Sequence, residues 1–198
     1  DDKWLTYTVL LRNNILQPKT AIVGHEKLLQ NQVKEIGGKF PMIVKTTTGA
    51  GGFGVVKVEK ESNLLSTIQL IQSLNSSADI ILQEFIETEY DVRVMVLHDE
   101  VVATLKRPLV QSDFRSNITQ GNKPKRIKIT ELEKTECIKA AKAVKGKWVG
   151  VDFIPSDDRE NKPPYILEVN GSPGTLFINE LNDIDIFKLT LKYTFYKV

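Results

Sequence analysis

Glycine is concentrated in one short segment that lies between two β-branched runs. Residues 49–54 read Gly-Ala-Gly-Gly-Phe-Gly, with the strand-like run 42–45 before them and Val55–Val58 after them. We therefore expect a strand–loop–strand hairpin. Without a Cβ, the backbone N–H groups of such a loop can approach phosphate groups closely. Lys45 would add a positive charge beside them. The segment indicates a phosphate-binding loop, and a plain flexible hairpin is the alternative.

Two other glycine motifs share this spacing, and the surrounding sequence disfavours both. The dinucleotide fingerprint G-x-G-x-x-G requires a helix after the loop, whereas a strand pattern follows here. Residues 49–56 also match the protein-kinase form G-x-G-x-x-G-x-V. However, the chain has no His-Arg-Asp segment, and residues 113–115 and 152–154 only approach Asp-Phe-Gly. A protein kinase is therefore disfavoured.

Asp152, Glu168 and Asn170 form a second candidate site. The loop between their two strands is centred near residues 158–160, so folding the strands back places Asp152 beside Glu168. Side-chain alternation puts Glu168 and Asn170 on one face, with Leu167 and Val169 on the other. Two close carboxylates repel each other, and a divalent cation removes that conflict. Carboxylate and amide oxygens suit Mg²⁺. The alternative is a pair of solvent-facing carboxylates, one of them paired with a lysine.

Arginines make up the third candidate group. Arg93, Arg107 and Arg115 can bind phosphate or carboxylate through planar guanidinium groups, although any one of them could be a surface ion-pair partner. Residues 113–118, with Gly121 after them, concentrate hydrogen-bond donors in a loop-like region. The basic run 123–128 lacks aromatic residues, which favours a solvated edge over the binding of an acidic substrate.

An α+β fold must position these groups, because helical and strand-like patterns alternate in blocks. Thr130 and Glu133 form a capping-box pattern, Ser62 can cap another helix, and Gly37-Gly38 can end a third. Helices are predicted at 3–14, 25–36, after Ser62, at 130–145 and at 184–196; strands are predicted at 42–45, 55–58, 80–86, 92–97, 101–105, 149–154 and 165–169. The polar break at 87–90 predicts a division into two lobes.

Composition limits the classes of protein that the chain can be. Its 198 residues are 41% hydrophobic and 26% charged, with a net charge of +2, which gives no overall field for nucleic acid. No apolar run is long enough for a transmembrane helix or a signal peptide. His25 and His98 lack metal-ligand spacing. The single cysteine, Cys137, is expected in the core, and it favours a reducing cytoplasm.

Taken in order, these segments resemble the ATP-grasp carboxylate–amine ligases, and most closely the RimK branch of ribosomal-protein glutamate ligases. The landmarks span nearly the whole chain. They are residues 2–3, 40–45, the glycine loop, 83–86, 91–93, 113–117 (Asp-Phe-Arg-Ser-Asn), 150–152 and 167–174 (Leu-Glu-Val-Asn-Gly-Ser-Pro-Gly).

The resemblance implies an ATP-grasp fold with two α+β lobes and a nucleotide held between two antiparallel sheets. Residues 1–14 would be a leading helix, 15–88 a small lobe with the glycine loop, and 89–198 a large lobe with the metal site. The implied nucleotide contacts are Lys3, Lys45, Gly51, Gly52, Gly54, Glu84, Phe85, Ile86, Asp91, Arg115, Ser116 and Asn117. Arg93, Arg107 and Arg115 would be catalytic, while Asp152, Glu168 and Asn170 would hold Mg²⁺ or Mn²⁺.

The implied function is ATP- and Mg²⁺-dependent ligation of a carboxylate to an amine through an acyl phosphate, with glutamate added to a protein or peptide C-terminus. Two alternatives are a ligase for a small-molecule amino-acid or cofactor intermediate and a non-catalytic nucleotide-binding module. The partners are an amino-acid donor and a carboxylate acceptor, without nucleic acid or membrane, and branch relatives often form homo-oligomers. Relatives normally carry a further small α/β domain before the first motif, so a fragment or an unusually short enzyme is expected. Pro108 replaces an arginine that the branch often shows.

Overall fold

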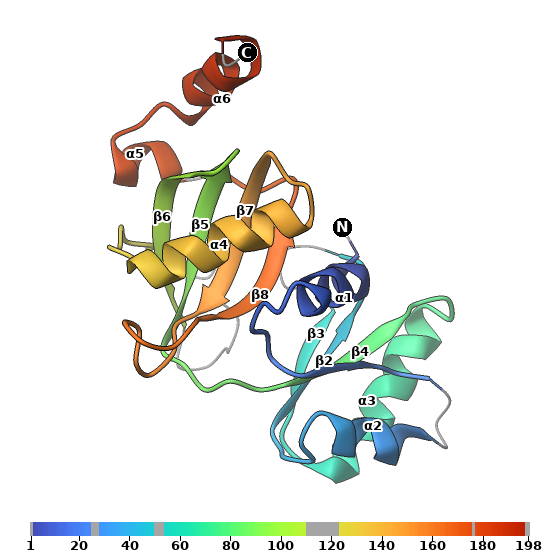
Figure 1. Ribbon diagram of the computed structural model, residues 1–198. Helices are drawn as coiled ribbons and strands as arrows, with labels where there is room; N and C mark the ends of the chain where they lie inside the picture. Colours follow the sequence, from blue (N-terminus) through green and yellow to red (C-terminus); the bar gives the residue numbers. More distant parts are fainter. Residues whose placement is uncertain (1, 25–27, 50–53, 110–122, 176, 197–198) are drawn as a thin grey trace. The chain divides into compact units, whose positions relative to one another are not determined.

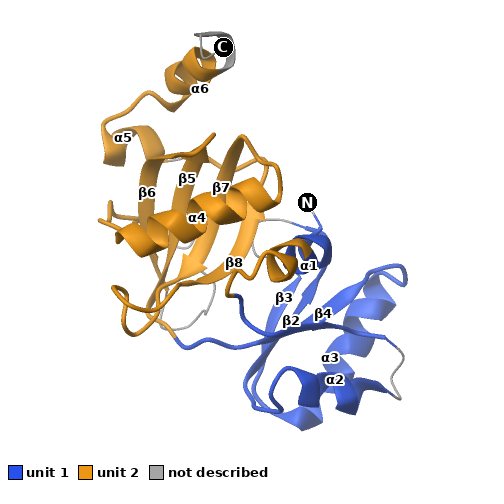
Figure 2. Ribbon diagram, viewed as in Figure 1, with its two compact units in different colours: residues 1–8, 17–87 blue, residues 9–16, 88–198 orange. Residues whose placement is uncertain are grey.

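Two antiparallel four-stranded sheets organise the chain in the computed structural model (Figure 1). The structure describes residues 2–24, 28–49, 54–109, 123–175 and 177–196. Contacts divide the chain into two units, one formed by residues 1–8 and 17–87 and the other by 9–16 and 88–198 (Figure 2). The second unit thus includes residues 9–16, which the sequence did not predict. The predicted division at 14/15 and 88/89 stays a prediction.

The sheet of the first unit has the order β1-β4-β2-β3. Its apolar side chains point to one face, where Met42, Val44 and Leu82 pack against Leu64 and Ile68 of a helix. The strands are β1 (Thr20–Ile22), β2 (Met42–Thr46), β3 (Val55–Val58) and β4 (Ile80–Glu84), and the helices are α2 (Leu29–Glu35), α3 (Glu61–Leu74) and the start of α1 (Lys3–Arg12).

The hairpin predicted around the glycine loop is present. β2 and β3 pair antiparallel, with Lys45 opposite Val55. The predicted glycine end of the second helix is also confirmed, because Gly38 N–H donates to the Val33 carbonyl at 2.8 Å and Gly37 N–H to the Lys34 carbonyl at 3.0 Å.

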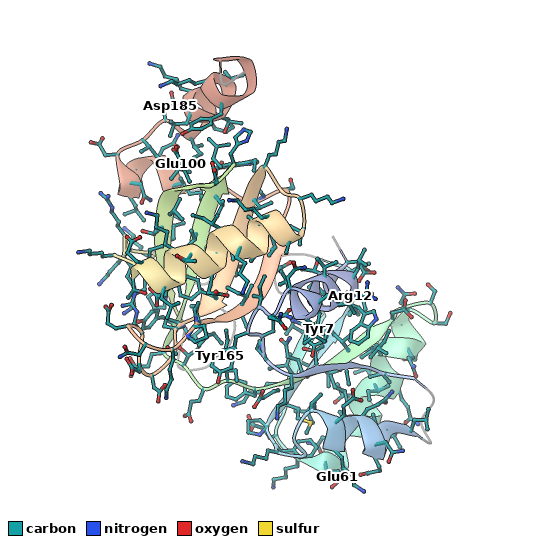
Figure 3. All side chains as sticks on the ribbon, in the orientation of Figure 1. Tyr7, Arg12, Glu61, Glu100, Tyr165 and Asp185 are labelled. Carbon is teal, nitrogen blue, oxygen red and sulfur yellow. The ribbon has the colours of Figure 1, made fainter. Side chains whose placement is uncertain are left out.

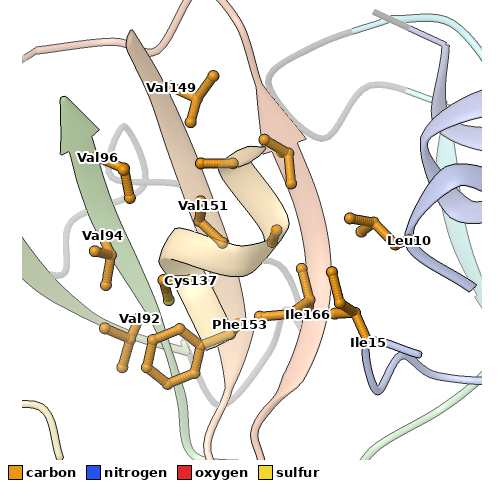
Figure 4. Close-up of a cluster of buried hydrophobic side chains, with 13 residues drawn as sticks. Leu10, Ile15, Val92, Val94, Val96, Cys137, Val149, Val151, Phe153 and Ile166 are labelled. Atoms are coloured by element: carbon orange, nitrogen blue, oxygen red, sulfur yellow. The ribbon is translucent and has the colours of Figure 1, made fainter. Parts of the chain in front are cut away.

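The sheet of the second unit has the order β6-β5-β7-β8, and α4 covers one of its faces. Figure 4 shows this core, to which β5 contributes Val92, Val94 and Val96 and β7 contributes Val149, Val151 and Phe153. Cys137 of α4 is fully buried in it, as predicted. The elements are β5 (Tyr90–Leu97), β6 (Glu100–Pro108), α4 (Glu131–Ala143), β7 (Trp148–Ile154), β8 (Tyr165–Asn170), α5 (Ile178–Asn182) and α6 (Ile186–Tyr196).

Helices α5 and α6 cover part of the opposite face of that sheet. Ile178 and Ile186 pack there against Met95, Ala103 and Leu105. The contact extends to the β5–β6 hairpin, where the Tyr193 ring stacks on His98 and the Tyr193 hydroxyl donates to Glu100, which is labelled in Figure 3. Among the described residues, no helix is long and apolar enough to cross a membrane.

Two local predictions were wrong, and two short elements were missed. Ser62 does not cap α3, because the helix starts at Glu61 with Lys60 at its N-cap. The strand predicted at 80–86 ends at Glu84. β1 and α5 were not predicted, since three and five residues are too short for a clear periodic signal.

A register shift also corrects the predicted faces of β8. Asp152 pairs with Glu168, but Phe153 pairs with Ile166, so Leu167 has no direct partner. The side chains of β8 in the α4 core are therefore Ile166 and Val169. Leu167, which simple alternation places beside Val169, is not part of that core.

The capping box predicted at α4 is confirmed, and its buried Glu133 also forms an ion pair with the partly exposed Arg159. Glu133 N–H donates to Thr130 Oγ1 at 3.1 Å, and Thr130 N–H donates to Glu133 Oε2 at 2.9 Å. Arg159 Nε and Nη2 donate to the same carboxylate, both at 2.7 Å. Glu133 is 1% exposed, so water cannot readily replace its carboxylate as the acceptor for these donors.

We expect Glu133→Ala to lower the free energy of unfolding by about 2–3 kcal/mol, because charge-assisted hydrogen bonds are lost at a buried position. Glu131→Ala is the matched control in the same helical turn, with a side chain 88% exposed. Its effect should stay within about 0.5 kcal/mol. Urea unfolding followed by circular dichroism measures both; equal effects would contradict this role of Glu133.

Candidate active site

The candidate site residues Asp91, Arg93 and Asp152 of the second unit lie on the face of its sheet away from α4. Because side chains alternate along a strand, Val92 and Val94 of β5 enter the α4 core while Asp91 and Arg93 point to the other face. On β7, Asp152 lies between the core residues Val151 and Phe153 and shares that other face.

Strand register brings these residues into neighbouring rows. Arg93 lies opposite Asp152, which in turn lies opposite Glu168 on β8. In the adjacent row, Asp91 lies opposite Arg107. The predicted proximity of Asp152 and Glu168 is thus present, and two of the three predicted arginines flank them.

Two arginines and two aspartates form one continuous ion-pair network. Arg93 donates to both oxygens of Asp152, at 2.7 Å from Nε and 2.6 Å from Nη2. Arg107 binds Asp91 in the same bidentate way, at 2.7 and 2.8 Å, and its Nη2 also donates to Asp152 at 2.8 Å. Asp91, Arg107 and Asp152 are 7%, 8% and 5% exposed. The two positive charges balance the two negative ones.

Mutual pairing favours the charged forms of Arg93, Arg107 and Asp152. Burial alone would raise the pKa of Asp152, but Arg107 and Arg93 outweigh it and hold the pKa well below its usual range. The charge of Asp152 raises the pKa of Arg93. Burial alone would lower the pKa of Arg107, yet Asp152 and Asp91 raise it above its ordinary value.

This network corrects the electrostatic argument drawn from the sequence. We expected Asp152 and Glu168 to repel each other until a cation or a lysine intervened. Instead, two arginines already compensate the charge of Asp152. Repulsion between the carboxylates therefore does not by itself require a metal ion, and a metal assignment must rest on the donor set.

That donor set fits a hard cation. Glu168 is partly buried, and its side chain makes no hydrogen bond or ion pair with the described residues. The Asn170 amide oxygen accepts from Ser172 N–H at 2.8 Å and keeps a second lone pair. Within the described ranges, no three His, Cys, Asp or Glu side chains form a metal-binding group. Two carboxylates and an amide oxygen remain ligands suited to Mg²⁺.

Gly150 on β7 allows close packing on this face of the sheet. A Cβ added at Gly150 would lie 2.8 Å from Pro173 Cβ and 3.7 Å from Arg93 Nε. Only glycine therefore lets the segment after β8 pack against the sheet beside Arg93. This close approach explains why glycine precedes Val151 and Asp152, a feature that the sequence alone did not explain.

In the first unit, Lys3 and the ends of the glycine loop are held together. Lys3 Nζ donates to the Gly49 carbonyl at 2.7 Å, and its backbone N–H donates to the Thr47 carbonyl at 2.8 Å. Gly54 has φ +72° and faces Thr46 Oγ1, which an added Cβ would approach to 2.9 Å. The loop thus starts beside a lysine and returns through a position that requires glycine.

Lys45 points to the face of the first sheet that α2 and α3 do not cover. Val44 and Leu82 enter the core with those helices, so Lys45 and Gln83 share the opposite face. Lys45 Nζ donates to Gln83 Oε1 at 2.9 Å. The sequence marked Lys45 but assigned no role to Gln83, because the contact depends on the pairing of β2 with β4, which the sequence did not predict.

The segment 84–86 begins at the end of β4. Glu84 Oε2 accepts from Lys19 N–H at 3.2 Å, and the Lys57 ammonium lies 4.5 Å from the centre of the Phe85 ring. The predicted nucleotide contacts of Glu84, Phe85 and Ile86 remain predictions. Five predicted site residues lie outside the described residues: Gly51, Gly52, Arg115, Ser116 and Asn117.

Comparison with known families identifies the chain. The sequence model of the RimK-like ATP-grasp domain matches residues 1–193, and the chain therefore belongs to this family. It is 35% identical over 187 residues to a protein of Trichodesmium erythraeum named probable alpha-L-glutamate ligase, covering 93% of this chain and 60% of that protein. A Haemophilus influenzae protein of the same name is 34% identical, covering 97% and 62%. The chain thus spans about three fifths of these relatives.

Solved structures confirm the predicted α+β ATP-grasp fold. The ATP-grasp ligase PsnB, in complex with a precursor peptide and AMPPNP, superposes with a TM-score of 0.69 at 22% identity, over 93% of this chain and 55% of that one. D-alanine–D-alanine ligase from Bacillus anthracis in complex with ATP gives 0.70 at 20% identity, over 89% and 56%.

Proposed function

We propose that this chain belongs to an ATP- and Mg²⁺-dependent carboxylate–amine ligase that adds glutamate to the C-terminus of a protein or peptide. The network of Arg93, Arg107, Asp91 and Asp152 beside Glu168 is the observation that carries the proposal. It fixes two guanidinium groups as hydrogen-bond donors beside a carboxylate–amide donor set on one sheet face. The relatives named probable alpha-L-glutamate ligase and the neighbour bound to a precursor peptide support the glutamate and the peptide.

The proposed reaction has two steps. A carboxylate oxygen of the acceptor attacks the γ-phosphorus of ATP, the bond to the bridging oxygen breaks, and an acyl phosphate and ADP form. The amine of glutamate then attacks the acyl carbon, phosphate leaves with the bonding electrons, and the amine loses a proton to solvent. No nucleophilic side chain is needed, so positioning and charge stabilisation account for the catalysis.

Each group of residues has a proposed role in these steps. Lys3, Lys45 and the glycine loop would bind the nucleotide phosphates, and residues 84–86 would meet the adenine. Arg93 and Arg107 would stabilise the negative charge that develops on the transferred phosphoryl group, since their raised pKa values keep them cationic. Asp152, Glu168 and Asn170 would hold Mg²⁺, which neutralises phosphate charge when bound. Arg115, Ser116 and Asn117 complete the proposed phosphate contacts.

The domain roles follow the same proposal. Residues 15–88 would act as the small lobe with the phosphate loop, and residues 89–198 as the large lobe with the metal site.

A coupled assay with matched acceptors tests this function. ADP release is measured with ATP, Mg²⁺, glutamate and a peptide with a free C-terminal carboxylate, and compared with the same peptide amidated at that end. We expect release only with the free carboxylate, and a product mass increased by whole glutamyl residues. Release with free amino acids but with no peptide would favour a small-molecule ligase. ATP binding without release under any condition would favour a non-catalytic module.

A further inference from the structure

A chain of three hydrogen bonds runs from Lys45 across the first sheet. Lys45 Nζ donates to Gln83 Oε1 at 2.9 Å, and Gln83 Nε2 donates to Thr20 Oγ1 at 2.8 Å. The Thr20 hydroxyl donates to the Pro18 carbonyl at 2.9 Å. Lys45, Gln83 and Thr20 are 9%, 7% and 5% exposed, so water replaces these partners poorly.

The direction of this chain is fixed at both ends. A lysine ammonium can only donate, so the oxygen of the Gln83 amide must face Lys45. The amide nitrogen is thereby turned toward Thr20, whose oxygen must accept. The Pro18 carbonyl can only accept, so it takes the hydroxyl proton of Thr20. A single arrangement of donors and acceptors satisfies every member.

Strand register explains why these residues meet. Gln83 of β4 lies directly opposite Thr20 of β1 and opposite Ile43 of β2. Lys45 is two residues beyond Ile43 on the same face, within diagonal reach of the Gln83 side chain. Three strands therefore contribute to the position of one ammonium group, and the short strand β1 has a role beyond the edge of the sheet.

We propose that Gln83 and Thr20 are positioning residues that hold the Lys45 ammonium where it binds nucleotide phosphate. This inference rests on the proposed function, because it takes ATP as the ligand of Lys45. Gln83 supplies a neutral acceptor, so it fixes the ammonium without cancelling its charge. Thr20 fixes the orientation of the Gln83 amide, so it acts on Lys45 only through Gln83.

Two substitutions of Gln83 separate position from charge. Gln83→Leu removes the acceptor, and we expect the Kd for Mg·AMPPNP to rise about 10-fold, as for loss of a partner that orients a ligand-binding group. Gln83→Glu keeps an acceptor for Lys45 but pairs the ammonium with a negative charge that opposes the phosphates. We expect the Kd of Gln83→Glu to rise at least as much as that of Gln83→Leu. Its midpoint of thermal unfolding should nevertheless fall less than the midpoint of Gln83→Leu.

Thr20 and Gln32 provide graded controls. Thr20→Val removes the oxygen that accepts from Gln83 and should raise the Kd about 3-fold, the size expected for one neutral hydrogen bond. Thr20→Ser retains the hydroxyl and should restore binding. Gln32 donates to the Ile22 carbonyl of β1 at 2.6 Å but makes no hydrogen bond to Lys45, Gln83 or Thr20. Gln32→Leu should therefore change stability and leave the Kd unchanged.

Isothermal titration calorimetry with Mg·AMPPNP, together with thermal unfolding, distinguishes the outcomes. If the unchanged protein binds the nucleotide and Gln83→Leu binds it equally well, the positioning role is wrong and the proposed function stands. If affinity falls only in proportion to stability, with Gln32→Leu behaving like Gln83→Leu, Gln83 is merely structural. If the unchanged protein does not bind the nucleotide, the proposed function fails and this inference fails with it.

Discussion

Replacing Asp152 with asparagine is expected to abolish ligation and also to destabilise the protein. The carboxylate accepts three hydrogen bonds, two from Arg93 and one from Arg107. Asparagine offers one oxygen and turns an NH₂ donor toward a guanidinium donor. Asp91 would then be the remaining carboxylate of a network that holds the buried Arg107 and the partly buried Arg93.

The expected loss in the free energy of unfolding is about 3–5 kcal/mol, the cost of removing one partner from a buried ion pair. This is a large share of a total stability of about 5–15 kcal/mol. Urea unfolding measures the loss, and ADP release at a temperature where the variant is folded measures ligation. Unchanged stability would contradict the description of Asp152 as the balancing charge.

Two further variants separate the network from surface charge. Asp157→Asn removes a carboxylate whose partner Lys162 is solvent-exposed, and it should leave the unfolding midpoint unchanged. Arg93→Met combined with Asp152→Asn leaves Arg107 paired with Asp91, so stability should partly recover while ligation does not. A double variant no more stable than Asp152→Asn alone would show that the two residues are not coupled.

Acid should remove the same stabilisation. Because the pKa of Asp152 is lowered in the folded protein, its contribution is complete above its unfolded pKa of about 3.9. The contribution falls as pH drops below that value toward the folded pKa. Asp152→Asn should accordingly show a shallower loss of stability on acidification than the unchanged protein.

The sequence predicted this site best where its signal was local. The β2–β3 hairpin follows from β-branched runs around four glycines, and the capping box of α4 follows from Thr130 and Glu133. The pairing of Asp152 with Glu168 came from the centre of a single loop. In each case a few neighbouring residues fix the geometry, so no long-range pairing has to be known.

Contacts that depend on strand order could not be predicted. Arg107 reaches Asp152 across β5, and Gln83 reaches Lys45 because β4 lies between β1 and β2. Neither order follows from periodicity. Asp91 illustrates the consequence, since the resemblance implied a nucleotide contact for it, whereas the structure pairs it with Arg107. Its proposed nucleotide contact remains a prediction.

Glu168→Gln is expected to reduce ligation strongly without changing stability. Glu168 lies opposite Asp152, yet its side chain makes no hydrogen bond or ion pair with the described residues. Glutamine has the same shape as glutamate and keeps one carbonyl oxygen, so the free energy of unfolding should change by less than about 0.5 kcal/mol. A metal-ligand role instead requires the negative charge, and its loss should lower kcat by about 10²–10³-fold.

The control for this substitution is Glu160→Gln, which neutralises an exposed carboxylate in the loop between β7 and β8 and should retain full activity. Mg²⁺-dependent binding of AMPPNP provides a readout other than turnover, and Glu168→Gln should require more Mg²⁺ for half-maximal binding. If Glu168→Gln kept both turnover and its Mg²⁺ requirement, the metal assignment would fail. Because Asp152 balances the charges of Arg93 and Arg107 while Glu168 makes no ion pair with the described residues, Asp152→Asn should lower both activity and stability, and Glu168→Gln should lower activity alone. This contrast separates the structural role of Asp152 in the ion-pair network from the ligand role that it shares with Glu168.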